Sequence, residues 1–252
     1  MKYIPPINTL RISVKLHEPN MDGIEKALEV PSQFEQRTAT EVLRGIIDPI
    51  ERPGAVADPR MWSVNERMFV IASYMSATRE DGPDFPIGEG KFSDYLLDAS
   101  DYVADVPFEC AGRALIYSPL HGYQAEIIET LLVGGNYSNT SYSWWKACIA
   151  ACVRGADEEP LQYQDDNQYE ALLVDRIKDV GSLGDSDFVE LFDAYQLAAQ
   201  RGAHMVYAIT NAHGVLAAQV SEPPEGVPVL APARFPSRSA ISKRAREIMG
   251  VL

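Results

Sequence analysis

The chain is poor in the residues that most enzymes use. Its 252 residues include only three Cys and four His. No stretch has the Gly-x-Ser-x-Gly pattern of a nucleophile elbow, the Lys-Ser/Thr ending of a phosphate-binding loop, or the close Cys and His spacing of common metal sites. These absences disfavour the enzyme classes that carry such motifs. We therefore expect a protein without catalytic activity and without a bound cofactor.

Long hydrophobic runs are also missing. No apolar run approaches the roughly 18 residues of a membrane span, and Pro5 and Pro6 interrupt the stretch where a signal peptide would be apolar. The three cysteines are too few, and odd in number, for a disulfide framework, which is typical of a reducing compartment. We expect a cytosolic chain with free thiols and no membrane span.

Positive charge is scarce. The formal charge is −14, so the average surface repels nucleic-acid phosphates and anionic membranes. The hydrophobic fraction of 46% and the charged fraction of 23% are those of an ordinary globular protein. A chain of this length buries about 70–75% of its unfolded surface and needs no disulfide or metal to stabilise its core.

Helical spacing of apolar residues dominates the pattern. It predicts helices over 22–29, 38–47, 63–77, 91–103, 123–132, 144–153, 169–180 and 186–201. The best-marked start is Ser63, because Glu66 follows three residues later as in a capping box. Helices 169–180 and 186–201, joined by Gly181–Gly184, are predicted to form a helical hairpin.

The β component is predicted to be small. Strands are expected over 10–16 and 113–117, Pro107 is expected to end the helical segment predicted over 91–103, and residues 205–220 favour a β-hairpin over a helix. Residues 221–236 contain five prolines and predict an extended arm before a basic tail helix. The sequence thus predicts a mainly α, α+β fold divided into 1–105, 106–220 and 221–252.

The cysteines allow one metal-site hypothesis. Cys148 and Cys152 lie four residues apart on a predicted helix and share a face, and Cys110 with a histidine could complete four ligands. However, small apolar residues surround the pair, and zinc and iron–sulfur sites usually have a two-residue spacing on a turn. The pattern favours buried core thiols.

Histidines and acidic clusters give weaker signals. His121, His204 or His213 could act as a general base, but no recognisable nucleophile setting accompanies them. The acids at 157–159, 165–166, and 185 and 187 lack the alternating spacing, central glycine and closing glutamate of a calcium loop. We interpret them as solvated loops and helix caps.

Two features predict contacts with other proteins. Trp144 and Trp145 are adjacent on a predicted helix and point in different directions, so one could be core and the other an interface anchor; burial of both is the alternative. The arm and its basic tail helix are predicted to dock on a neighbour such as the acidic face of another copy, and a frayed terminus is the alternative. The tail residues are Arg238, Lys243, Arg244 and Arg246.

Three stretches together resemble the baseplate-hub and tail-assembly proteins of tailed bacteriophages. They are residues 60–85 (RMWSVNERMFVIASYMSATREDGPDF), 112–131 (GRALIYSPLHGYQAEIIETL) and 169–195, with its L-L-x-x-R-I … L-x-x-x-D-F pattern. The resemblance covers about half of the chain and carries no active site to transfer. It implies a non-enzymatic virion or assembly protein made in the bacterial cytoplasm.

On this basis we expect a structural component of a phage baseplate or tail tip. Its partners would be other tail or baseplate proteins or further copies of the chain, with Trp144 and Trp145 as anchors. One alternative is a transient tail-assembly chaperone that is absent from the mature virion. A second alternative is a bacterial adaptor without a phage connection. A third is an enzyme, which would be either a hydrolase without a recognisable motif or a metal-dependent hydrolase that uses Cys110, Cys148 and Cys152.

Overall fold

A computed structural model of the chain describes residues 4–98, 101–135, 137–220, 228–235 and 237–250. Within these residues the fold is α+β and mainly helical, with small antiparallel sheets, which confirms the predicted class. The α-helices are α1 (Met21–Glu29), α2 (Glu35–Ile46), α3 (Val64–Thr78), α4 (Gly122–Val133), α5 (Ser141–Cys152), α6 (Asp166–Gly181), α7 (Asp185–Arg201) and α8 (Lys243–Ile248). The strands are β1 (Ile7–Asn8), β2 (Ser13–Leu16), β3 (Ile47–Pro49), β4 (Pro86–Ile87), β5 (Gly90–Lys91), β6 (Val106–Cys110), β7 (Arg113–Tyr117), β8 (Val153–Gly155), β9 (Ala208–Asn211) and β10 (Gly214–Ala217).

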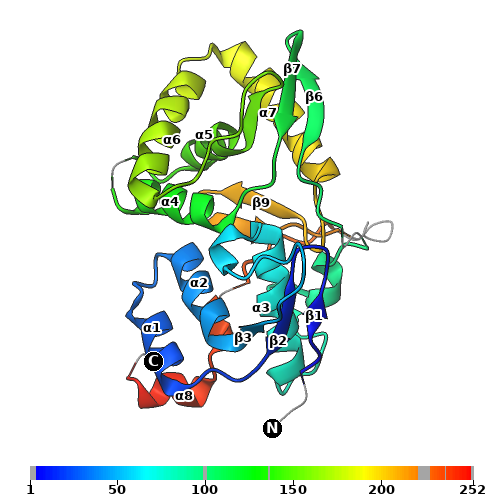
Figure 1. Cartoon of the computed structure of the whole chain (residues 1–252), viewed down its shortest axis with the longest axis vertical. Helices are drawn as coiled ribbons and strands as arrows, with labels where there is room; N and C mark the ends of the chain where they lie inside the picture. The colour runs from blue at the N-terminus through cyan, green and yellow to red at the C-terminus, as the bar shows by residue number, and fades with distance from the viewer. Residues whose placement is uncertain (1–3, 99–100, 136, 221–227, 236, 251–252) are drawn as a thin grey trace.

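One end of the molecule holds α1, α2, α3, α8 and the sheet β1–β2–β3 (Figure 1). Helices α1 and α2 cross at Gly23 and Gly45, where a Cβ atom added to Gly23 would lie 3.4 Å from the Gly45 Cα atom. An added Cβ atom at either position would already be in van der Waals contact with the other helix, so the two glycines allow a close crossing. Asn20 caps α1 by accepting a hydrogen bond from Gly23 N.

The other end holds α5, α6, α7 and the sheet β6–β7–β8 (Figure 1). Helix α6 packs mainly on α5 and α4, whereas α7 packs mainly on β6, β7 and α5. The predicted helical hairpin of 169–180 and 186–201 is therefore wrong in its packing, although both helices exist. The reason is aromatic contact with other elements: Phe192 of α7 packs on Trp145, and Tyr195 packs on Tyr117.

Two local predictions need correction. Of the predicted helix 91–103, the described residues 91–98 and 101–103 contain no α-helix; a short 3-10 helix covers Phe92–Tyr95, and Asp94 accepts a hydrogen bond from Lys91 N. Pro107, which was predicted to end that helix, lies inside β6. Strand β6 is at the edge of its sheet, where a proline without an N–H group is tolerated. The hairpin predicted within 205–220 is confirmed as β9 and β10.

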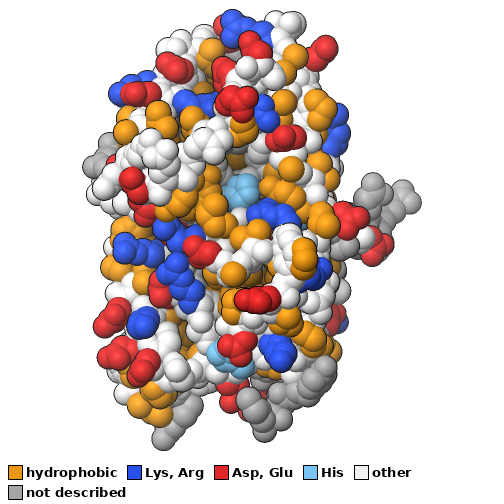
Figure 2. Space-filling view, in the orientation of Figure 1, with side chains coloured by type: hydrophobic (Ala, Val, Ile, Leu, Met, Phe, Trp, Pro, Cys, Tyr) orange, Lys and Arg blue, Asp and Glu red, His pale blue; other side chains and the backbone are white. Residues whose placement is uncertain are grey.

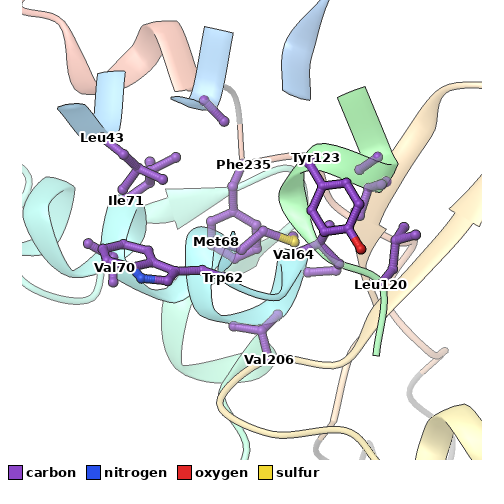
Figure 3. Packing of buried hydrophobic residues seen from close by; sticks show 14 of the residues in the cluster. Leu43, Trp62, Val64, Met68, Val70, Ile71, Leu120, Tyr123, Val206 and Phe235 are labelled. Carbon is purple, nitrogen blue, oxygen red and sulfur yellow. The ribbon is translucent and has the colours of Figure 1, made fainter. Parts of the chain in front are cut away.

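Both ends share one hydrophobic core, which extends through the middle of the molecule. Figure 3 shows Trp62, which precedes α3, in one buried cluster with residues from distant parts of the chain, among them Tyr123, Val206 and Phe235. All four side chains are buried. Because the core is continuous, the boundaries predicted near residues 105 and 220 separate segments of one packed structure.

The C-terminal segment folds back on its own chain. Ala233 pairs with Ala217, and the ring of Phe235 packs edge-on against Tyr95 with centroids 6.1 Å apart. Arg238 donates a hydrogen bond to the backbone oxygen of Val30. Residues 228–235 are thus extended, as predicted, and pack on this molecule. The first part of the predicted arm, 221–227, lies outside the described residues.

Candidate functional site

The starts of α3 and α4 meet in the middle of the molecule. Backbone hydrogen bonds join them, because Val64 N donates to Leu120 O and Gly122 N donates to Trp62 O, each at 2.8 Å. The N-cap residues of both helices therefore lie next to each other. Titratable side chains from four separate parts of the chain gather around this point.

Ser63, the N-cap residue of α3, faces His204. The Ser63 Oγ atom lies 3.0 Å from His204 Nε2, and His204 Nδ1 lies 3.2 Å from the backbone oxygen of Gly202. Because a carbonyl oxygen only accepts, Nδ1 carries the proton and Nε2 accepts from the Ser63 hydroxyl. The same hydroxyl oxygen accepts from Glu66 N at 3.2 Å, which completes the predicted capping box.

This serine–histidine pair has the contact through which a base can activate a hydroxyl group. Both side chains are 0% exposed, however, and burial lowers the pKa of His204, so the imidazole is neutral. The polar atoms of the two side chains are satisfied within the fold. The pair therefore fixes the start of α3 to the segment that follows α7, and a substrate would reach it only if the surrounding core opened.

His121, the N-cap residue of α4, lies beside a second polar group. The Tyr102 hydroxyl is 3.3 Å from His121 Nε2, and the Arg11 guanidinium lies 4.0 Å from the centre of the Tyr102 ring. Arg11 also pairs with the buried Glu66 at 3.5 Å. Burial, and then the charge of Arg11, lower the pKa of His121 to about 4. His121 is therefore neutral at pH 7.

An ionic network that is buried at Arg67 and reaches the surface at Asp166 lies next to these helix starts. The Arg67 side chain donates to Thr40 Oγ1 at 2.7 Å and pairs with Glu126 at 3.5 Å. Glu126 also pairs with Arg60 at 2.9 Å, and Arg60 reaches Asp166 at 2.7 Å. This network connects α2, α3, α4 and the start of α6. Removing one partner would leave an uncompensated charge, which is strongly destabilising when it is buried.

The three cysteines are core residues, as the pattern favoured. Cys110, Cys148 and Cys152 are free thiols with exposed fractions of 8%, 0% and 3%. Burial raises the pKa of Cys148 to about 12, so this thiol stays protonated. In the part of the chain that the structure describes, no three or more His, Cys, Asp or Glu side chains are grouped so that they could hold a metal ion.

The two predicted tryptophan anchors differ in position. Trp144 is 1% exposed, and its Nε1 donates to Asn139 Oδ1 at 2.9 Å. Trp144 is therefore a core residue, and its prediction as a partner contact is wrong because its side chain points inward. Trp145 is only partly buried and donates to Thr210 O at 2.8 Å. Part of the Trp145 side chain therefore stays accessible to solvent.

Trp145 belongs to a row of aromatic side chains between α5 and α7. The Trp145 and Phe192 rings lie 4.7 Å apart, Phe192 and Phe188 lie 6.2 Å apart, and Phe188 and Tyr142 lie 5.1 Å apart. Tyr142 is 45% exposed, and the other three rings are partly exposed. We call these four residues the aromatic strip. It is an apolar surface that the chain does not cover fully.

Helix α7 is packed less deeply than the other long helices. Of its 17 residues only Ala198 is buried. Val189 is 50% exposed and Leu197 is 63% exposed, although both are large and apolar. Exposed single apolar residues are common, but several on one helix beside an aromatic row mark a candidate contact surface.

The basic tail residues lie at the opposite end of the molecule from α7. Lys243 of α8 pairs with Glu247 at 3.9 Å, and Arg246 lines the same groove as Arg79. This groove, of about 920 Å³, separates α8 from the end of α3 and is lined by side chains of both charges. The side chain of Arg244 lies outside the described part. A partner role for Arg238, Lys243, Arg244 and Arg246 stays a prediction.

The remaining candidates lie near the surface. His213 is exposed in the turn between β9 and β10. Asp185 and Asp187 lie in the first turn of α7 after its N-cap residue Gly184, where the helix dipole favours acids. Figure 2 shows acidic, basic and hydrophobic side chains interspersed on one face of the molecule. This view shows no large area of a single charge sign.

Comparisons with known proteins give no relative: no protein-family model, curated protein or solved structure matches the chain significantly. None of the helices in the described residues has the length and apolar character needed to cross a membrane. Because no relative was found, the site must be interpreted from its own geometry.

Sequence reasoning missed the main features of both candidate regions. It gave Ser63 and Glu66 their capping role but did not bring His204 next to Ser63, because 141 residues separate them. It also gave the phenylalanines of α7 a shared face without pairing them with Tyr142 and Trp145. The available signal was the shared helix face of Phe188 and Phe192, which are four residues apart, together with the adjacent tryptophans of another predicted helix.

Proposed function

We propose that the protein is a non-enzymatic structural component of a bacteriophage tail, in the baseplate or tail tip, and that it binds other tail proteins. The observation that carries this proposal is the aromatic strip, with Trp145 at one end and the exposed Tyr142 at the other. The resemblance of three stretches of the sequence to phage tail proteins supports the proposal that the assembly is a phage tail.

The chemistry of the strip favours protein contacts. Aromatic side chains bury a large area with little loss of conformational freedom, and they dominate the energetics of many interfaces. Hydrogen bonding holds Trp145 in place through Thr210 O at 2.8 Å, so its exposed edge is already oriented. A preorganised anchor of this kind lowers the entropic cost of association.

The polar cluster in the middle of the molecule is consistent with this proposal. Ser63 and His204 are enclosed and hydrogen-bonded to each other, and His121 is paired with Tyr102. These groups contribute to the packing of helix starts. Their geometry gives no reason to prefer the alternative of an enzyme.

The test is to look for the chain in purified particles. Peptide mass spectrometry of virions from the phage that encodes it should detect the chain at a fixed copy number relative to other tail proteins. Detection only in tail-assembly intermediates would replace the proposal with the alternative of a transient chaperone. Absence from both would overturn the proposal.

A complementation experiment links particle assembly to the strip. Phage lacking the gene should form normal tails when supplied with the wild-type chain and few tails when supplied with Val189→Glu, which places a charge on α7 next to Phe188 of the strip. The matched control is Leu10→Glu, because Leu10 is 62% exposed and lies outside α7. Equal loss of tails with both variants would show that the strip has no special role.

A further inference from the structure

The aromatic strip has an acidic edge. Asp185, Val189 and Asp193 are spaced four apart on α7, so their side chains form one row along the helix. Phe188 and Phe192 lie next to this row, because Phe188 directly precedes Val189 and Phe192 directly precedes Asp193. The exposed Val189 thus extends the apolar surface, and a carboxylate lies on either side of it.

The two carboxylates have no ion-pair partner among the described residues, and both residues are exposed. The neighbouring acid Glu190 differs, because it accepts a hydrogen bond from Ala111 N at 2.9 Å and so belongs to the contact with the β6–β7 turn. Lys146 lies over the Tyr142 ring of the strip, with its Nζ atom 5.3 Å from the ring centre, and forms no ion pair with either carboxylate among the described residues. The acidic edge is therefore available to an external cation.

The surrounding helices have the same charge sign. Residues 165–201, which span α6 and α7, contain nine Asp and Glu but only three Lys and Arg. All three cations are already engaged: Arg176 donates to Val153 O, Lys178 pairs with Asp175 at 2.8 Å, and Arg201 donates to Pro107 O at 3.5 Å. Any segment that covers the strip enters a negative field, which favours basic flanks.

We propose that the aromatic strip docks an amphipathic helical segment of a partner protein, whose apolar face covers Trp145, Phe192 and Val189 and whose Lys or Arg residues pair with Asp185 and Asp193. This inference rests on the proposed function, because it names the chemistry of the partner at the same surface. An apolar helix face in a hydrophobic groove with complementary charges at the rim is a common mode of recognition.

A symmetric contact between two copies fits this surface less well. In a two-fold interface the same patch is present on both sides, so Asp185 and Asp193 of one copy would face the same acids of the other. Like charges placed opposite each other cost free energy and select against the pairing. The charge of the edge therefore points to a different, basic partner surface.

The probe is a synthetic helical peptide with a leucine face and lysine flanks, compared with the same leucine face flanked by glutamate. Calorimetry on the full-length chain should detect binding of the lysine peptide only. The double variant Asp185→Asn/Asp193→Asn should weaken this binding about tenfold, and Val189→Asp should weaken it at least as much. The same titration can be followed by tryptophan fluorescence. The part of the change that is lost in Trp145→Phe arises at the strip.

The matched control is Glu25→Gln/Glu29→Gln, which removes the same charge from the exposed side of α1. If this control weakens binding as much as the α7 double variant, the peptide recognises net charge and the inference is overturned. Failure of the lysine peptide to bind, equal binding of the glutamate peptide, or oligomers of the chain that Val189→Asp abolishes would also overturn it. These results leave the detection in virions unaffected, so the two proposals can fail separately.

Discussion

The Glu129 carboxylate caps the first turn of α2, where it accepts a hydrogen bond from Gln36 N at 2.9 Å. The N-cap residue of α2, Phe34, has no side chain that can accept such a bond. Arg37 N lies 3.4 Å from the same carboxylate. A side chain 93 residues away thus supplies the acceptor that Ser, Thr, Asp or Asn usually provides locally.

Glu129 should make the protein less stable as the pH rises toward neutrality. Burial raises the pKa of Glu129 to about 7, although the hydrogen bonds from Gln36 and Arg37 act in the opposite direction. Because the folded value exceeds the unfolded one of 4.5, its contribution is complete below pH 4.5 and is lost by about pH 7. The loss is about 3 kcal/mol at most. Urea unfolding of Glu129→Gln between pH 4 and 8 should lack this decline; an unchanged slope would contradict the assignment.

His121 should make the protein more stable as the pH rises from about 4 to 6.5. Its folded pKa of about 4 is below the ordinary value of 6.5, so its contribution to stability is complete above pH 6.5 and is lost as the pH falls toward 4. The expected loss is about 3 kcal/mol. In His121→Gln the acid side of the stability profile should be flatter than in the wild type. If the variant and the wild type lose stability equally below pH 6, His121 is not buried in its neutral form.

The parts of this fold that were predictable depend on short-range chemistry. Ser63 and Glu66 form a capping box within one helical turn, and the sequence predicted the start of α3 correctly. The cap that Glu129 places on α2 could not be predicted in this way, because nothing near α2 indicates it. The same holds for Ser63 and His204, which only the tertiary packing brings together.

The predictions that failed involve side-chain packing. Phe92 and Tyr95 have helical spacing, but only a 3-10 turn forms, and both side chains are buried next to Phe235 of the returning C-terminal segment. Trp144 and Trp145 were correctly placed on one helix. Their different exposure depends on what packs on each face, which a pattern in one segment does not contain.

Gly122→Ala should destabilise the protein. A Cβ atom at this position would lie 2.3 Å from Arg67 Nη1, and the Arg67 side chain is enclosed and bonded to Thr40. Relief of this overlap requires movement of a buried charge, so we expect a loss of about 1–3 kcal/mol in thermal or urea unfolding. The control Gly181→Ala adds its Cβ atom 3.3 Å from the Cδ atom of the flexible Lys146. It should change stability by less than about 1 kcal/mol; equal losses would contradict the argument.

Replacement of the two adjacent tryptophans should separate their roles. Trp144 is 1% exposed and lies so close to Gly214 that a Cβ atom added there would be 3.5 Å from its Cζ2 atom, so Trp144→Ala should cost about 3–5 kcal/mol of unfolding free energy. Trp145→Ala removes a partly exposed ring and one hydrogen bond to Thr210, and should cost about 1–2 kcal/mol. Urea unfolding monitored by circular dichroism measures both. Equal losses would mean that Trp145 is a core residue in solution, and the aromatic strip would then lose its anchor.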